Sequence, residues 1–361
     1  MLIIIHLRGG ADGLNMVIPY RQDAYFRARP TIAIPREQVI ALGATGLHPA
    51  FAPLLPAYGQ GDVAFVAGVG LPNATLSHFE ARDDVESGGV GDTRPVTGWL
   101  ARWLEMQPDV RALLPVVVFG ETLPRILFGA TGACVIRRLS DLKLSAKSAQ
   151  FGQSLRRLYA HSTRRAAARG VELLDALESL DVDAKGDAPS AGYPATAFGE
   201  QLYGVELLSR AGLTLAASIE LDGWDTHIAQ GAAEGLQAQL ISTLASGLAN
   251  FHQRLGDGLR LTRVIVMTEF GRRVAENNSG GTDHGRASVA LVIGSGIGGG
   301  KIHGDWGSLE PSRLDGDGNV APSVDLRQVV AEALGWVQDG PRLAAVFPGF
   351  QPSHEVGLGR A

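Results

Sequence analysis

The chain has 361 residues, 45% of them hydrophobic, and a formal net charge of −5 at pH 7. These values predict a globular protein with a sizeable core, arranged as one large α/β domain or two smaller ones. The acidic balance argues against nonspecific binding to nucleic acid, which needs a basic surface, and favours small or neutral partners. No apolar run reaches the roughly 18 residues that a spanning helix needs, so no membrane span is expected.

Apolar runs alternate with amphipathic stretches along the chain, which predicts strands that alternate with helices. Strands are expected at 2–7, 62–68, 114–119, 213–221, 264–267 and 288–294, and helices at 47–58, 97–106, 139–178, 197–210 and 231–255. This alternation favours a doubly wound α/β fold, a mostly parallel sheet with helices on both faces. Within one domain over 1–361, we expect a helical flank or cap and a mobile loop (185–194) inside 139–200.

The sequence does not decide whether the protein works in a reducing or an oxidising compartment, or whether it is exported. Cys134 is the single cysteine and cannot form an internal disulfide, so it does not indicate the compartment. The first expected strand follows Met1 directly and leaves no room for a secretion signal. A signal is therefore either absent or removed, and a cytoplasmic location is compatible with this sequence.

Polar residues follow the first expected strand, at the edge where open parallel sheets bind ligands. The loop reads Arg-Gly-Gly-Ala-Asp-Gly-Leu-Asn and matches neither the Walker A pattern nor the dinucleotide fingerprint. Asp12 is a candidate ligand or catalytic group, Asn15 a candidate donor to substrate, and Arg8 a candidate for binding an oxyanion. For Asp12 and Asn15 a simple turn-forming role is an equal alternative.

Ser77 and His78 precede a helix-compatible run. Glu80 lies three positions after Ser77, which is the pattern of a capping box and by itself favours a plain N-cap serine. A helix amino terminus also offers N–H groups that stabilise an approaching anion, so Ser77 is the best candidate nucleophile. His78 is a candidate for coordinating a metal or donating to an anion, with simple packing as the alternative.

Acids and imidazoles also follow three later strand positions. Asp225 and His227 come after the strand at 213–221, Glu269 ends the strand at 264–267, and Asp283 and His284 precede the strand at 288–294. Each alone could be a capping acid or a surface histidine. Carboxylate oxygens and imidazole nitrogens together suit zinc, manganese or a similar divalent ion, so we predict a metal centre or polar catalytic centre.

Four further polar residues have weaker indications. Arg272 and Arg273 follow Glu269 closely, and one of them is expected to neutralise it or bind substrate through the planar guanidinium. His303 lies after the last expected strand, where a substrate contact at the rim and simple exposure are both reasonable. His6, inside the first strand, is expected to be a satisfied core histidine.

Five sequence blocks together resemble the signature segments of a bacterial family called domain of unknown function 1501. They lie at 7–15, 77–83, 223–227, 268–272 and 282–285, so the resemblance spans the whole chain. That family is related to the alkaline phosphatase and sulfatase superfamily, which implies a doubly wound α/β sheet and a metal-dependent ester-hydrolysis site at the strand ends. Members resemble exported proteins, which implies a periplasmic or exported location.

The resemblance implies roles for individual residues. Ser77 resembles the nucleophile at a helix start, Asp225 and His227 resemble a mid-chain metal-binding pair, and His284 resembles the late histidine ligand. The expected reaction is hydrolysis of a phosphate or sulfate ester, carried by a small molecule or a glycan, with Ser77 or a metal-activated water as the nucleophile.

Two positions depart from the superfamily pattern. Phe270 stands where a metal-binding histidine is usual, and the acid after the first strand is displaced to Asp12. We therefore expect one ion, zinc or manganese, in preference to two. Its expected ligands are Asp225, His227, Glu269, Asp283 and His284. The alternative is a noncatalytic descendant of the fold that binds a glycan or a partner protein through the same cleft.

Overall fold

A nine-stranded sheet forms the centre of the molecule in the computed structural model, which describes residues 1–72, 75–107, 112–142, 149–161, 165–180, 186–353 and 355–359. The strand order is β13-β5-β12-β9-β1-β8-β6-β7, and β14 pairs with β5. Among the described strands of this large sheet, β12 alone runs antiparallel to its neighbours. The expected mostly parallel sheet is thus confirmed.

The strands of this sheet are short and mostly buried, as their apolar runs predict. They are β1 (Leu2–Leu7), β5 (Val63–Gly70), β6 (Val116–Phe119), β7 (Ala133–Ile136), β8 (Ala216–Leu221), β9 (Arg263–Thr268), β12 (Ser288–Ile293), β13 (Lys301–His303) and β14 (Val324–Asp325). Two small sheets accompany it, one of β2 (Val17–Ile18), β4 (Thr45–Leu47) and β3 (Ile40–Leu42), the other of β10 (Gly271–Arg272) and β11 (His284–Gly285).

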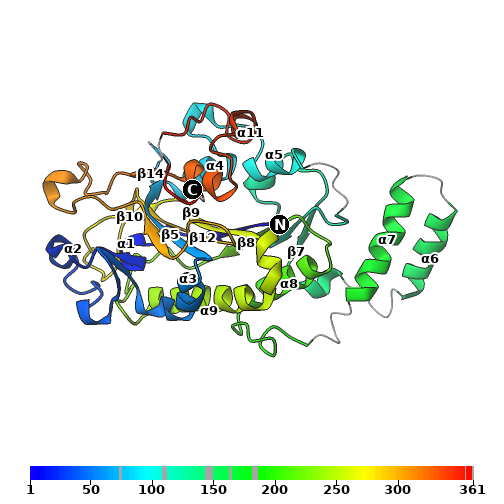
Figure 1. Cartoon of the computed structure of the whole chain (residues 1–361), viewed down its shortest axis with the longest axis horizontal. Coiled ribbons are helices and arrows are strands. Elements are labelled where there is room, and N and C mark those ends of the chain that lie inside the picture. The colour runs from blue at the N-terminus through cyan, green and yellow to red at the C-terminus, as the bar shows by residue number, and fades with distance from the viewer. Residues whose placement is uncertain are drawn as a thin grey trace.

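Helices cover both faces of the large sheet (Figure 1). Below it in Figure 1 lie α3 (Leu55–Gly59), α8 (Ala197–Arg210) and α9 (Leu236–Leu255), and above it lie α4 (His78–Ser87), α5 (Trp99–Glu105) and α11 (Gly340–Val346). The shorter helices α1 (Gly13–Met16), α2 (Asp23–Ala28) and α10 (Leu326–Ala333) complete the main body. The doubly wound arrangement is therefore present.

The central strand β1 shows how the two faces share the core. Its side chains alternate, because successive residues of a strand point to opposite faces. Ile3, Ile5 and Leu7 join one buried apolar cluster with residues of α8 and α9, whereas Leu2 and Ile4 join a second cluster with residues of α5 and α10. Burial on both faces leaves only the strand ends of β1 for polar groups.

The helix expected at 47–58 is divided in the structure. A 3-10 helix (Pro49–Leu54) precedes the short α3. Pro53 and Pro56 lack the backbone N–H that a continuous α-helix would use, so the proline spacing explains the division. The apolar residues of this segment, Phe51 and Leu54, are still buried against the main core.

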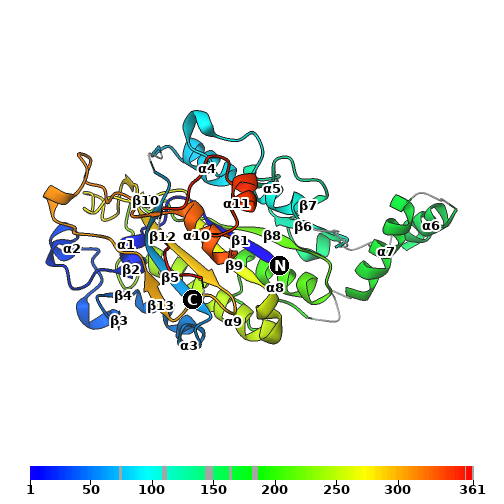
Figure 2. The same cartoon turned by 45° about the horizontal axis from the view of Figure 1, so that its top comes forward.

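The helical stretch expected at 139–178 forms a hairpin of α6 (Ala149–Ala160) and α7 (Arg165–Leu180) within the described part of the chain. Both views place this hairpin beyond β7, at one extreme of the molecule, so it flanks the sheet (Figures 1 and 2). Arg156 on α6 pairs with Glu178 on α7 at 2.9 Å. The mobile loop expected at 185–194 begins with Lys185, which lies outside the described residues. The single-domain interpretation stays a prediction.

The end of the sheet that matters for the site is the carboxyl edge of β1, β8 and β9. The small β10–β11 ladder lies beyond it and pairs Arg272 with His284. Among the helices that the structure describes, none is long and apolar enough to cross a bilayer.

Candidate metal centre

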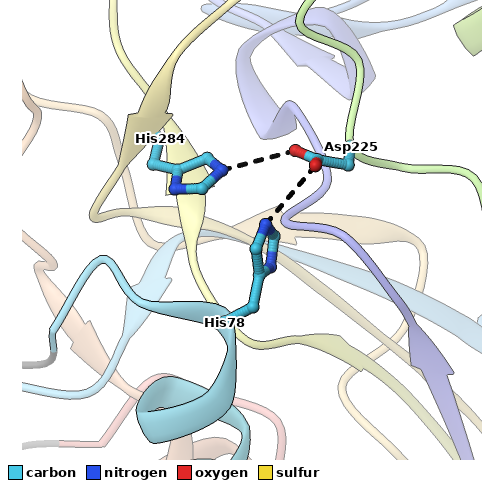
Figure 3. A group of neighbouring side chains, drawn as sticks. All are labelled: His78, Asp225 and His284. Atoms are coloured by element: carbon cyan, nitrogen blue, oxygen red, sulfur yellow. Dashed lines mark hydrogen bonds and ion pairs between the residues drawn. The ribbon is translucent and has the colours of Figure 1, made fainter.

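Four side chains from separate parts of the chain converge beyond the carboxyl ends of β1, β8 and β9. His78 is the first residue of α4, Asp225 and His227 follow β8, and His284 begins β11. Figure 3 shows His78, Asp225 and His284 pointing toward one another from three different elements. We call these four residues the histidine cluster.

The distances within the histidine cluster match the ligand set of one ion. Asp225 Oδ1 lies 3.1 Å from His227 Nε2 and 3.3 Å from His284 Nε2, and these two nitrogens are 3.0 Å apart. Asp225 Oδ2 lies 3.5 Å from His78 Nε2. Atoms that bind one tetrahedral zinc at about 2.0–2.1 Å are separated by roughly 3.3 Å. The ligand atoms of His78, Asp225 and His284 all lie within 4.8 Å of one another, so these three residues could hold one small cation after a modest approach of their atoms, with His227 beside them.

The outer nitrogen of two imidazoles faces an oxygen that can only accept. His78 Nδ1 lies 3.0 Å from Glu269 Oε1, and His284 Nδ1 lies 2.9 Å from the carbonyl oxygen of Leu76. Each Nδ1 therefore carries the proton and donates, which leaves the Nε2 lone pair directed into the histidine cluster. Metal-binding histidines characteristically donate their other N–H to a carboxylate or carbonyl in this way.

His227 shows the same arrangement with a longer contact. Its Nδ1 lies 3.4 Å from Asp283 Oδ1, and Asn277 Nδ2 donates to that same oxygen at 3.1 Å. The hydrogen bond from Asn277 is the main cause that lowers the pKa of Asp283 below its ordinary value, so this carboxylate is charged at neutral pH. Asp283 thus contacts the outer nitrogen of His227 and not its Nε2, and its expected role as a direct ligand stays a prediction.

Glu269 also lies behind a ring of the histidine cluster, against Nδ1 of His78, although we expected it to be a ligand. Its side chain is 2% exposed, and Oε1 accepts from the N–H of Gly9 at 2.8 Å as well as from His78. Burial alone would raise the pKa of Glu269, but the hydrogen bonds from His78 and the backbone outweigh it and lower the pKa. The hydrogen bond to Glu269 in turn raises the pKa of His78.

The protonation states of the inner residues favour binding a cation. Burial lowers the pKa of His284 below its ordinary value, so the ring is neutral at pH 7. Burial would raise the pKa of Asp225, but the hydrogen bond and charge of Arg272 more than offset this and lower it. His78 Nε2 is buried and has no hydrogen-bond partner within the described structure. The histidine cluster thus presents a negative carboxylate at Asp225, a neutral ring at His284 and an Nε2 of His78 without a hydrogen-bond partner in the described structure.

Arg272 does not reach the substrate side, contrary to expectation. Its side chain is fully buried, and five oxygens surround the guanidinium. These are the carbonyl oxygens of Gly9, Gly10, Trp224 and Thr282, and Asp225 Oδ1 at 2.6 Å. Because Arg272 joins the loops after β1 and β8 to Asp225, it positions the carboxylate of the histidine cluster.

Asp12 and Asn15 form a separate buried network, which corrects their expected catalytic and substrate roles. Arg29 NH1 and NH2 pair with Asp12 Oδ2 and Oδ1 at 2.5 and 2.9 Å, and NH1 also donates to Asn15 Oδ1. Gln230 donates to Asp12, and Tyr25 donates to Asn15. Asp12 and Asn15 are 1% and 0% exposed. Their polar atoms hold the first loop in place.

Arg8 and His303 are likewise engaged elsewhere. Arg8 is 7% exposed and forms ion pairs with Glu86 and Glu220. The two ring nitrogens of His303 lie 3.0 and 2.7 Å from the carbonyl oxygens of Val356 and Gly298. Neither side chain has a free donor directed at the histidine cluster in these contacts, so neither is placed as a substrate-binding group.

Ser77 lies at the expected helix start but does not form the expected capping box. Its backbone is extended, α4 begins at the next residue, and the Ser77 side chain makes no capping hydrogen bond. Glu80 is exposed. The hydroxyl is therefore not committed to the helix, and it stands one residue from His78. Part of the preceding loop, Asn73 and Ala74, lies outside the described residues.

Phe270, the main departure from the superfamily pattern, forms a wall of the histidine cluster. Its buried ring lies 4.8 Å from the ring of His78 and 4.7 Å from that of His284, measured between centroids. Gly10 permits this packing, because a Cβ on Gly10 would lie 2.4 Å from the Phe270 ring. Phe270, which stands where a ligand was expected, thus packs against the rings of His78 and His284.

Two positioning groups escaped the sequence interpretation altogether. The acceptor for His284 is a backbone carbonyl, that of Leu76, and a carbonyl has no sequence signature. Asn277 lies in a polar loop whose composition resembles any turn. The spacing Asn-x5-Asp between Asn277 and Asp283 is too generic to have identified it.

A family model described as "Protein of unknown function (DUF1501)" matches residues 45–335. No protein of curated function matches the chain. Among solved structures, one titled "Crystal structure of Ps i-CgsB" is 10% identical with a TM-score of 0.36, covering 84% of this chain and 68% of that one. A phosphonate monoester hydrolase of Agrobacterium radiobacter is 11% identical with a TM-score of 0.27, covering 85% and 71%. Likenesses this low do not bear on the function of this chain.

Proposed function

Because this chain belongs to the DUF1501 family of proteins of unknown function, we propose its activity from the geometry of its own residues: metal-dependent hydrolysis of a phosphate or sulfate ester. The observation that carries the proposal is the arrangement of the three imidazoles. Each has Nδ1 facing an oxygen acceptor and Nε2 facing Asp225. Such paired outer contacts serve to orient metal ligands.

His78, Asp225, His227 and His284 would hold the ion, and Glu269 and Asp283 would orient two of the rings. One carboxylate with imidazole nitrogens is a donor set that suits zinc or manganese. A bound divalent ion would act as a Lewis acid toward an oxygen of the phosphoryl or sulfuryl group. A single ion accords with Phe270, which occupies the neighbouring space as an apolar wall.

The residues around Ser77 would supply the nucleophile side of the site. Its hydroxyl makes no capping bond, and the first turn of the ten-residue helix α4 directs N–H groups toward the same end. The oxygen of Ser77 or of a water would form the new bond to phosphorus or sulfur. The bond to the leaving-group oxygen breaks, and the leaving alcohol takes up a proton. If Ser77 is the nucleophile, a water would then attack the same phosphorus or sulfur, the bond to the Ser77 oxygen would break, and that oxygen would regain a proton, so that one water is consumed per ester.

Calorimetric titration of metal-free protein with zinc and with manganese tests this proposal. We expect one ion per chain in the unchanged protein and loss of that binding in His284→Ala. His252→Ala is the matched control, because His252 forms a histidine–aspartate pair with Asp62 at 3.0 Å that is not part of the histidine cluster. Equal metal binding by His284→Ala and the control would contradict the proposed centre.

Hydrolysis is the second measurement, made on the metal-loaded protein with aryl phosphate and aryl sulfate esters. We expect turnover that His284→Ala abolishes and His252→Ala retains. Metal binding without turnover of either ester would favour the alternative of a noncatalytic descendant that binds a glycan or a partner through this surface.

A further inference from the structure

Two large apolar side chains project into solvent from positions that directly follow residues of the histidine cluster in the chain. Phe79 follows His78 and is 84% exposed, and Ile228 follows His227 and is 70% exposed. Neighbouring Cα atoms are about 3.8 Å apart, so each apolar residue stands at the rim of the cluster. A single exposed apolar residue needs no explanation. Here two exposed apolar residues each adjoin a ligand of the same proposed ion.

The loop that presents Ile228 is built to hold its shape. Ala229 has φ of 49°, and it is the one residue other than glycine with a positive φ in the described part of the chain. Its N–H donates to the carbonyl of Ser279 at 2.9 Å, and Asn277 Nδ2 donates to the carbonyl of His227 at 2.9 Å. Backbone strain of this kind persists only where surrounding contacts enforce it, and it is concentrated at functional sites.

The position of Phe79 is set by its neighbour. His78 points inward, where Glu269 accepts its Nδ1 hydrogen at 3.0 Å. Successive helix residues are rotated by about 100°, so the side chain of Phe79 leaves α4 in a different direction, toward solvent. The contact that holds the ring of His78 therefore also helps to hold the backbone from which the phenyl ring of Phe79 projects.

We propose that Phe79 and Ile228 form an apolar rim that binds the hydrocarbon part of the substrate, namely an aryl or long alkyl group on the leaving alcohol. This inference rests on the proposed ester hydrolysis and deepens it, because it names the substrate class. The ester group would reach the histidine cluster while the hydrocarbon covers the two side chains at the rim. Small or fully polar esters would lack the second contact and bind weakly.

The test uses a series of nonhydrolysable phosphonates on the full chain loaded with zinc. Calorimetry compares methylphosphonate, hexylphosphonate and phenylphosphonate, which share the anionic group and differ in hydrocarbon. We expect the larger ligands to bind at least roughly tenfold more tightly than methylphosphonate to the unchanged protein. The variant with both Phe79→Ser and Ile228→Ser should bind all three alike, with its zinc stoichiometry unchanged.

Leu261→Ser is the matched control for removing an exposed apolar side chain. Leu261 is 80% exposed and lies before β9, at the opposite end of that strand from the histidine cluster. This control should keep the preference for large phosphonates. Equal affinities in the unchanged zinc-loaded protein, or a preference that survives the double substitution, would contradict the proposed apolar rim but not the proposed metal-dependent hydrolysis.

Two other outcomes are distinguishable. Failure of the unchanged protein to bind zinc would overturn the proposed function and the rim together. Sedimentation at the same concentrations separates a different occupant, a second copy of the chain. Dimerisation that the double substitution abolishes would overturn the assignment of the rim to substrate.

Discussion

Asp12 and Asp225 follow the neighbouring strands β1 and β8, and each pairs with an arginine, but the two pairs differ in their exposure to solvent. Asp12 and Arg29 are 1% and 0% exposed, and all five N–H groups of Arg29 meet oxygen acceptors. Asp225 is 47% exposed, although its partner Arg272 is fully buried. One pair is closed by protein on every side, while the other keeps a carboxylate facing three imidazole nitrogens.

The comparison shows what separates a structural ion pair from a functional one. Both arginines neutralise an acid and bind backbone carbonyls, so pairing itself does not decide the role. What differs is the set of lone pairs left over after the protein has satisfied its own donors. Asp12 meets Arg29 and Gln230, whereas Asp225 retains oxygens next to rings that offer lone pairs of their own. Adjacent lone pairs repel unless a proton or a metal cation lies between them.

Arg29→Met should produce the largest effect, and it acts on the closed pair. The substitution leaves Asp12 buried without its cation, so we expect a loss of about 3–5 kcal/mol in the free energy of unfolding. Urea denaturation measures it. Zinc binding by the folded fraction should be retained. A loss below about 1 kcal/mol would mean that the pair is not the structural element that its burial indicates.

Arg272→Lys tests the open pair. A lysine ammonium cannot meet five surrounding oxygens as the guanidinium does, so Asp225 should lose its fixed orientation. We expect zinc affinity to fall by roughly 10- to 100-fold, as for other groups that orient ligands. The matched control is Arg273→Lys at the next position. Similar losses in both variants would argue for a general effect of substituting this segment instead of a specific contact of Arg272.

Glu269→Gln should have a smaller effect on the same centre. The amide oxygen can still accept from His78, but the negative charge is lost, and we expect about a tenfold lower zinc affinity. The pKa of His78 is raised mainly by its hydrogen bond to Glu269. In the variant that pKa should fall, so protons should displace zinc at a lower pH than in the unchanged protein. Zinc titrations across pH 5–8 would show a shift in the opposite direction if Glu269 were itself a ligand.

We expect the smallest effect at His6, which is buried like Asp12 and Arg29 of the closed pair. It is buried in β1, and burial followed by the charge of Arg8 lowers its pKa well below the ordinary 6.5. The unfolded chain takes up a proton near pH 6.5 but the folded chain does not, so stability should decline as pH falls through that value. His6→Leu should lose less stability between pH 7.5 and pH 5.5. Parallel stability profiles in urea would contradict this.

The His6 ring also departs from expectation in one respect. It is buried as expected, but its Nε2 has no hydrogen-bond partner in the described structure. Strand periodicity could place the ring inside the sheet, but it could not show whether an acceptor would lie opposite. The same limit applies to Asp12, whose partner Arg29 comes 17 residues later in the chain. No local pattern links the two residues.

The fold was more accessible from the sequence than the site. Apolar runs predicted the core strands because burial on both faces demands them, although nothing in the run at 288–294 showed that β12 would be antiparallel. Strand ends predicted that Asp225, His227 and His284 would meet, and the structure brings them together. The same reasoning predicted that Glu269 and Asp283 would be ligands, whereas the structure places them against the outer nitrogens of His78 and His227. Strand position does not determine which of two neighbouring polar side chains faces the centre and which lies behind it. Metal binding stays a prediction.

The reversed direction of β12 has a consequence for how this site could change. Since β9 and β12 are antiparallel neighbours, the chain between them, residues 269–287, leaves the sheet and returns at the same edge without a crossover helix. This one excursion contains Phe270, Arg272, Asn277, Asp283 and His284. One residue of the histidine cluster and several of the groups that support it thus lie on a single hairpin, which could be lengthened, shortened or exchanged between relatives while the order of the strands beneath it remained as it is.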